Sequence, residues 1–272
     1  MSRINYNHFR PVTSGESLFQ FIISDVIGRS KISELQVLSI LQIGGRLEEF
    51  SDYYVGVFAA NLMARAIKKA ERLESLYPDS NENQNQLVRY IQESFEITRA
   101  SNSGVLDKFA FLTMQAEKSS RRDINSSTRK LSASRGLNNC YVCGRDIYEN
   151  TTDPSAKLEL EHIWPQSFGG DSKVENLLPS CCDCNREKGS MLLWQNSNVH
   201  SFVLKPSPSV DEWTSISRKE KIAQHRRSIF LYACQNKTTL KDAALAVGCV
   251  NLMSIRSLDG DDAVDFFNFS FV

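Results

Sequence analysis

The stretch Cys140-Tyr-Val-Cys143, together with its counterpart Cys181-Cys-Asp-Cys184, decides the fold of the middle of this chain. Two Cys-x-x-Cys pairs split by a few tens of residues have the ligand spacing of a four-cysteine zinc site, in which each short loop supplies two thiolates to one tetrahedral ion. Four buried free thiols would leave the matched spacing unexplained. We therefore expect Cys140, Cys143, Cys181 and Cys184 to hold one structural zinc ion.

The segment between the cysteine pairs predicts a compact unit. Polar and apolar residues alternate from Lys157 to Glu161, which indicates a short strand that ends with Glu161 and His162. Residues 163–170 indicate a loop, Val174–Leu178 a second strand, and Cys181–Lys188 a helix. So small a unit depends on its metal, since structural zinc can contribute ~10 kcal/mol or more to folding.

The order of motifs in this unit, Cys-x-x-Cys, then EHIWPQSFGG (161–170), then ENLLPSCCDCNREKG (175–189), resembles the HNH nuclease family and its ββα-metal motif. The loop 162–168 is also similar to that of the HNH domain in RNA-guided CRISPR nucleases. The resemblance covers about a fifth of the chain, from Asn139 to about Ser190. It implies a metal-dependent HNH endonuclease that hydrolyses phosphodiester bonds in DNA, with RNA left open as a substrate.

The resemblance also implies roles for individual residues. His162 would be the general base, because an imidazole pKa near ~6.5 suits activation of water at neutral pH. Glu161, where many members have aspartate, and Asn185 would hold one Mg²⁺ or Mn²⁺ through oxygen atoms. Asn176 would tie the loop that carries His162, and Lys188 would contact a phosphate.

A second function class stays open, a zinc-stabilised nucleic-acid-binding protein without catalysis. A histidine at a strand end is often structural, and an exposed carboxylate often has no ligand. The intact set of Glu161, His162 and Asn185 favours the nuclease, because a protein that only binds has no use for it.

Residues 1–117 predict a helical bundle. Thr13-x-x-Glu16 has the spacing of a capping box that opens the first helix. Further helices are expected over Ile32–Ile43, over Ser51–Leu76, around 87–95 and around 105–112. No residue in them indicates chemistry. We interpret the bundle as a unit that packs, dimerises or docks a partner, of which packing alone is favoured.

The two segments that flank the zinc unit are basic. Residues 118–136 are rich in serine and charge, which fits a solvated linker and a phosphate-binding arm equally well. Residues 137–205 carry six basic against nine acidic residues, so the module by itself is a poor surface for a polyanion. We therefore expect cations of the flanks, with one from the module, to bind nucleic acid: Arg121, Arg122, Arg129, Lys130, Arg186, Arg218, Lys219, Arg226 and Arg227.

The remaining C-terminal part, residues 206–272, predicts helices at about Ser217–Gln235 and Leu240–Val247, followed by an acidic and aromatic tail. Phe267, Phe269 and Phe271 alternate as in an edge strand. This strand is expected to pack on the chain's own domains, with strand addition to a partner as the alternative.

The whole chain is thus expected to be mainly α: a helical bundle at 1–117, a basic linker at 118–136, an HNH module at 137–205 and a helical region at 206–272. A net charge of zero excludes a global attraction to nucleic acid, and an apolar run of the ~20 residues that a membrane helix needs is lacking. Seven cysteines, an odd number, favour reduced thiols and a cytoplasmic protein. By analogy with small HNH nucleases, the chain would act in bacterial restriction or anti-phage defence, with a partner such as an ATPase bound through the helical domain or the tail.

Overall fold

The computed structural model describes residues 6, 8–28, 41–43, 49–77, 79–95, 99–133, 138–193, 209–252 and 269–271 of the chain. Its regular structure is mainly helical, as the sequence predicts. In the part of the chain so described, no helix joins the length and the apolar character that a bilayer crossing requires.

Within the described residues, four helices form the N-terminal region. They are α1 (Ser14–Phe21), which continues as a π-helical turn over Ile22–Gly28, then α3 (Glu49–Leu76), α4 (Ser80–Phe95) and α5 (Arg99–Ser120). The capping box that opens α1 is confirmed, since the Thr13 hydroxyl accepts from the Glu16 N–H at 3.1 Å and the Glu16 carboxylate accepts from the Thr13 N–H at 2.7 Å. Each helix buries an apolar stripe against the others.

The prediction of a helix over Ile32–Ile43 is wrong for its last three residues. Residues 29–40 lie outside the described part, but Leu41–Ile43 form strand β1, which pairs with β4 (Phe269–Phe271) in antiparallel register. Leu41 lies opposite Phe271 and Ile43 opposite Phe269. Apolar residues are thus paired in the register, and a long-range pairing overrides the local helical pattern. The expected strand in the tail is confirmed over these three residues and pairs within the chain.

The zinc unit contains a second antiparallel pair, β2 (Leu158–His162) and β3 (Leu177–Cys181), followed by helix α7 (Cys182–Lys188). The second strand begins later than predicted, because Val174–Asn176 form a 3-10 turn. Pro179 lies inside β3, opposite Leu160. A two-stranded sheet tolerates proline because each strand has an open edge, and the Pro179 carbonyl there accepts from the Tyr141 N–H at 3.0 Å.

Helices also occupy the flanks. The segment 118–136, which we interpreted as a linker, contains the end of α5 and helix α6 (Ser126–Ala133). After the module, α9 (Val210–Asn236) begins earlier than predicted because Ser209 and Glu212 form a capping box, and α10 (Leu240–Val247) has the predicted bounds.

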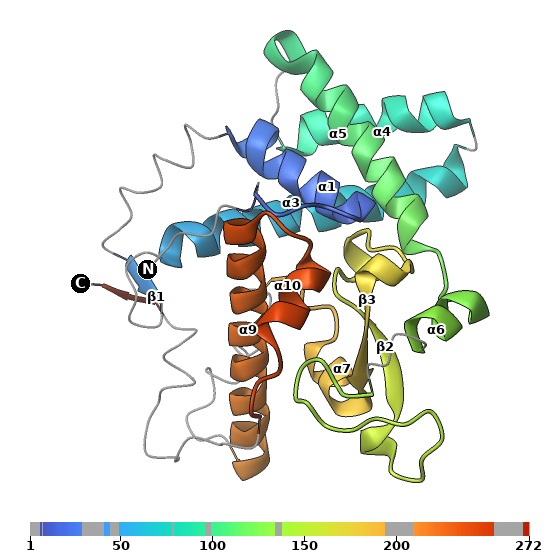
Figure 1. Cartoon of the computed structure of the whole chain (residues 1–272). Helices are drawn as coiled ribbons and strands as arrows, with labels where there is room; N and C mark the ends of the chain where they lie inside the picture. The colour runs from blue at the N-terminus through green and yellow to red at the C-terminus, as the bar shows by residue number, and fades with distance from the viewer. Residues whose placement is uncertain are drawn as a thin grey trace.

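Trp164 lies at the centre of the packing. Its side chain is fully buried and meets the rings of Phe9, Phe19 and Phe230 at centroid distances of 6.4, 5.4 and 6.4 Å. Trp164 therefore anchors the loop after β2 to the first helix and to α9. Figure 1 shows the consequence: β2, β3 and α7 lie below the N-terminal helices, with α9 and α10 on one side and α6 on the other.

The loop after β2 approaches α1 so closely that only glycine fits. The Gly15 N–H donates to the Gly169 carbonyl at 3.0 Å, and a Cβ at Gly15 would lie 2.1 Å from the carbonyl oxygen of Phe168. Gly169 itself has φ +76°, a left-handed conformation that favours glycine. The N-terminal helix and the loop are thus fitted backbone to backbone.

Candidate active site and metal centre

The four cysteines converge as their spacing predicts. Cys140 and Cys143 lie in the turn before β2, Cys181 ends β3, and Cys184 lies in the first turn of α7. Their sulfur atoms all lie within 4.8 Å of one another, and the Sγ atoms of Cys143 and Cys181 are 3.8 Å apart. Four thiolates at ~2.3 Å from a tetrahedral zinc ion would stand about 3.8 Å apart. The cluster could therefore hold a structural metal such as zinc.

Hydrogen bonds among the four thiols shift their pKa values in opposite directions. Hydrogen bonding from the Cys140 thiol lowers the pKa of Cys181 to about 6, and thiol contacts lower the pKa of Cys143 as well. The same contacts raise the pKa of Cys140 and Cys184. Thiols that share protons in this way are suited to exchange them for a cation.

His162 is the last residue of β2 and is partly buried. Its Nε2 lies 3.0 Å from the Ser172 hydroxyl oxygen. Burial, and then the positive charge of Lys188, lower the pKa of His162 from 6.5 to about 4, while Asp171 acts in the opposite direction. The imidazole is therefore neutral at physiological pH.

Glu161 lies next to His162 in sequence but on the other face of the strand. Its side chain is 3% exposed and forms an ion pair with Lys188 at 2.6 Å. The second carboxylate oxygen, Oε2, is buried and has no hydrogen-bond partner among the described residues. Burial raises the pKa of Glu161, against the opposing charge of Lys188.

Lys188 is a correction to the sequence analysis. We expected it to contact a phosphate, but its side chain is 1% exposed and its Nζ also donates to the backbone carbonyls of His162 and Gly189 at 3.2 and 3.4 Å. Lys188 is the last residue of α7, whose buried face lies against β2. A buried ammonium that neutralises Glu161 has no access to a substrate phosphate.

Asn185, on α7, contacts the face of β2 that carries Glu159. Its Nδ2 donates to Glu159 Oε2 at 2.6 Å. Because a carboxylate only accepts, it is the nitrogen of the Asn185 amide that binds Glu159, and the amide oxygen is free of this contact. The sequence analysis missed Glu159, although the strand period of two places it on the same face as Glu161.

Asn176 fastens the loop that follows His162. Its Oδ1 accepts from the Trp164 N–H at 2.7 Å, and its Nδ2 donates to the carbonyls of Trp164 and Asp171, each at 2.9 Å. The Asn176 backbone carbonyl accepts from the Ile163 N–H at 2.8 Å. One buried amide thus connects both ends of the loop.

The predicted nucleic-acid-binding cations differ in their exposure and in their ion pairs. Arg121 forms ion pairs with Glu74 and Glu117, and Lys219 lies 4.0 Å from Glu187. Arg218 and Arg227 are half-buried on α9. The side chains of Arg122, Arg129, Lys130 and Arg186 are exposed.

Arg226 is a second correction. It is 1% exposed, and its guanidinium donates to the Leu192 carbonyl at 2.8 Å, so it does not face a nucleic acid. Ile222 and Phe230, four residues before and after it, are buried too, which places Arg226 on the inner face of α9. Because Arg226 and Arg227 are consecutive, the sequence resembles an exposed basic patch at this point.

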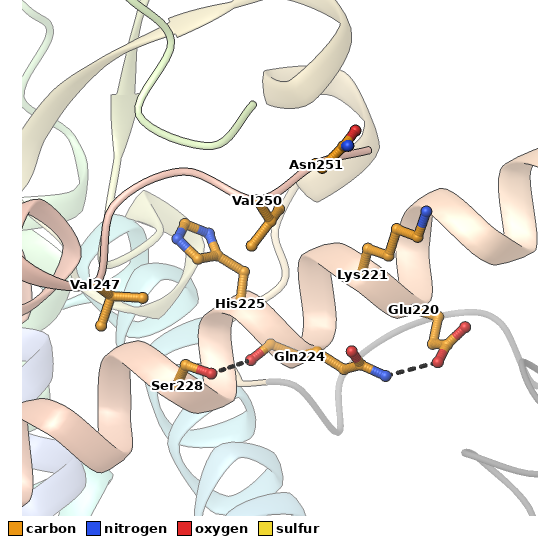
Figure 2. Close-up of a pocket in the computed structure, with 8 residues that line it drawn as sticks. All are labelled: Glu220, Lys221, Gln224, His225, Ser228, Val247, Val250 and Asn251. Carbon is orange, nitrogen blue, oxygen red and sulfur yellow. Dashed lines mark hydrogen bonds between the residues drawn. The ribbon is translucent and has the colours of Figure 1, made fainter. Parts of the chain in front are cut away.

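A pocket lies between α9 and the segment after α10, lined by residues that include His225, Gln224 and Val250 (Figure 2). The dashed bonds in Figure 2 join Gln224 to Glu220 and to Ser228 along α9. None of the lining residues belongs to the unit that carries His162 and the cysteines, so the pocket is separate from the candidate site.

Comparison with protein families gives one match, in which residues 140–198 fit the family described as HNH endonuclease. This segment is about a fifth of the chain and contains every cysteine of the metal cluster together with Glu161, His162 and Asn185. The match suggests nuclease activity on nucleic acid. Neither a curated protein nor a solved structure matches the chain.

Proposed function

We propose that this chain is a metal-dependent endonuclease that hydrolyses phosphodiester bonds in DNA. The observation that carries the proposal is a buried carboxylate, Glu161, whose second oxygen has no hydrogen-bond partner among the described residues and which directly precedes His162 in β2. A buried unpaired carboxylate oxygen costs free energy unless it binds a cation. The family match of the segment and the order of its motifs support the same reading.

In this proposal His162 accepts a proton from the attacking water, a role for which a neutral imidazole is ready at neutral pH. Glu161 and Asn185 would hold Mg²⁺ or Mn²⁺ through oxygen atoms. The ion, when bound, supplies charge stabilisation for the phosphate and the leaving oxygen. Glu159 binds the nitrogen of the Asn185 amide and leaves its oxygen free of that contact, and the Lys188 ammonium opposes the effect of burial on the pKa of Glu161.

DNA would be bound by the exposed cations near this site. Arg122, Arg129 and Lys130 belong to the end of α5 and to α6, and Arg186 belongs to α7. Their charge compensates for a module that carries more acids than bases. Charge reversal at Arg122 and Arg129 should weaken DNA binding and reduce its salt dependence, while the same change at Lys237, an exposed residue after α9, should not.

The activity is tested by cleavage of plasmid DNA with Mg²⁺ or Mn²⁺, with single-stranded DNA and RNA as further substrates. The wild type should cleave, His162→Ala should lose activity by ~10²-fold or more, and the exposed His8→Ala should keep it. An inactive wild type with each ion and substrate, or an active His162→Ala chain, would refute the proposal.

The alternative function, nucleic-acid binding without catalysis, is favoured by one observation: Lys188 already neutralises Glu161. If that pairing is permanent, no divalent ion enters. Calorimetry that measures Mn²⁺ binding to the zinc-loaded chain separates the two functions. Mn²⁺ binding that is lost in Glu161→Ala supports the nuclease, and DNA binding without any Mn²⁺ uptake supports the alternative.

We infer a role in restriction or anti-phage defence only by analogy with other small HNH proteins. Cells that express the wild type should then plate phage less efficiently than cells that express His162→Ala. A co-purified ATPase that is lost on deletion of residues 253–272 would identify the tail as its binding site.

A further inference from the structure

A carbonyl from outside the HNH domain reaches the neighbourhood of His162. At Arg122, two residues after the end of α5, the backbone carbonyl accepts a hydrogen bond from the Ser172 hydroxyl. The same carbonyl accepts from Gln166 Nε2 at 3.0 Å, which also donates to the Ser172 oxygen at 3.3 Å. Ser172 in turn lies 3.0 Å from His162 Nε2. The Arg122 carbonyl, the Ser172 hydroxyl and the Gln166 amide thus contact one another, and His162 joins them through Ser172.

Counting protons fixes the direction of each bond. A carbonyl oxygen only accepts, so the single hydroxyl hydrogen of Ser172 points to Arg122. The Ser172 oxygen must then accept from His162, and His162 Nε2 must carry the hydrogen. In the neutral imidazole that a general base requires, the other ring nitrogen, Nδ1, then carries the lone pair.

We propose that Ser172 is a positioning residue that, held by the Arg122 carbonyl, fixes the tautomer and the ring orientation of His162. The helical region therefore completes the site, although Arg122 lies outside the segment 140–198 that matches the HNH family. This inference rests on the proposed function, in which Nδ1 of His162 takes the proton of the attacking water.

Hydrogen bonds and ion pairs fix the backbone around Arg122, whose carbonyl binds Ser172. The Arg122 N–H donates to the Ser119 carbonyl at 3.3 Å, which continues the last turn of α5. Arg121 forms ion pairs with Glu117 on α5 and with Glu74 on α3, so the end of α5 is fastened to a second helix. Ser172 is 7% exposed, which protects its hydrogen bonds from competition by water.

Ser172→Ala and Ser172→Thr in the full-length chain test the proposal. Alanine removes the hydroxyl, whereas threonine retains it. Ser167→Ala is the matched control, because Ser167 lies in the same loop and is exposed. Circular dichroism and zinc content establish that each variant is folded.

The first readout is the tautomer of His162, observed by ¹⁵N NMR of the zinc-loaded, histidine-labelled protein without added Mg²⁺ or Mn²⁺. The signal is assigned by its loss in His162→Ala. We expect the Nε2–H tautomer in the wild type, in Ser172→Thr and in Ser167→Ala, and a mixture of tautomers in Ser172→Ala. An Nδ1–H tautomer in the wild type, or an unchanged signal in Ser172→Ala, would overturn the proposal.

The second readout is DNA cleavage. Ser172→Ala should lower kcat by ~10- to 100-fold with KM little changed, the size of effect typical of a group that orients a catalytic one, and Ser172→Thr should restore most of it. A wild type that shows the Nε2–H tautomer, lost in Ser172→Ala, but cuts no DNA supports the positioning role and refutes the nuclease. Equal kcat in Ser172→Ala and the wild type overturns the positioning role alone.

Discussion

At the scale of single residues, the buried pair of Glu161 and Lys188 links the stability of the fold to the proposed function of Glu161. Both side chains are almost completely buried, and their charges lie 2.6 Å apart. Taking two charges out of water costs free energy that their attraction only partly offsets, so such a pair is sensitive to the loss of one partner. An ion bound at Glu161 would take over the neutralising role of Lys188.

Replacement of Lys188 by methionine should therefore leave a buried, unpaired carboxylate. We expect the free energy of unfolding to fall by about 3–5 kcal/mol, measured by urea denaturation of the zinc-loaded chain. Lys157→Met, at an exposed position before β2, is the control and should change stability by less than about 0.5 kcal/mol. A Lys188→Met chain as stable as this control would contradict the buried ion pair.

At the scale of elements, contacts between α1 and the loop after β2 position the site as much as the zinc unit does. A Cβ at Gly15 would meet the Phe168 carbonyl oxygen at 2.1 Å and Trp164 Nε1 at 2.4 Å, both nearly immobile groups. Helices α9 and α10 hold the other side of the module. The Lys241 ammonium donates to the Val174 carbonyl at 2.5 Å, and the Val250 N–H donates to the Val142 carbonyl at 2.7 Å.

Gly15→Ala should push α1 away from this loop. We expect a loss of ~2 kcal/mol or more in the free energy of unfolding, together with a change in Trp164 fluorescence. Gly104→Ala is the matched control within α5: nothing lies within 4 Å of a Cβ there, and alanine should stabilise the helix by up to about 1 kcal/mol. If both substitutions behave alike, the close approach at Gly15 is not as described.

His225 on α9 makes stability depend on pH. Its Nε2 donates to the Gly248 carbonyl at 2.8 Å, and burial lowers its pKa from 6.5 to about 4. The folded pKa lies below the unfolded one, so the stabilisation by the neutral ring is complete above pH 6.5 and is lost as the pH falls toward 4. Glu16, whose pKa burial raises to about 7, acts in the opposite direction.

Over the range from pH 6.5 to about 5, the His225 contribution should fall by about 2 kcal/mol. The free energy of unfolding of His225→Gln should decline less steeply with acid than that of the wild type. Glu16 and His162 are present in both chains, so the difference between the two slopes reports His225. Parallel slopes would show that His225 titrates normally in the folded state.

At the scale of the whole molecule, one hydrophobic cluster includes residues of the N-terminal helices, the zinc unit and the C-terminal helices. Trp164 lies where the three regions meet, and the Arg10 N–H donates to the Thr238 carbonyl at 2.9 Å across the same junction. A change in the zinc unit should therefore spread to the rest of the fold.

Metal removal tests this coupling. The chain should carry one zinc ion by elemental analysis, lose it in Cys181→Ser and keep it in Cys249→Ser, whose cysteine is exposed and outside the cluster. Because structural zinc contributes ~10 kcal/mol or more, Cys181→Ser should unfold at a much lower temperature and expose Trp164. Zinc retained by Cys181→Ser, or an unshifted Tm, would contradict the assignment of the cluster.

The sequence alone determined the features that depend on short spacing: the cysteine cluster, the strand that ends with His162, helix α10 and most of the N-terminal helices. Tertiary structure decided what depends on long-range contacts. The pairing of Leu41–Ile43 with Phe269–Phe271, the burial of Arg226 on α9 and the bond from Ser172 to the Arg122 carbonyl join residues far apart in the chain. Local patterns report the period and the charge of a segment, but they do not report which face of it packing covers.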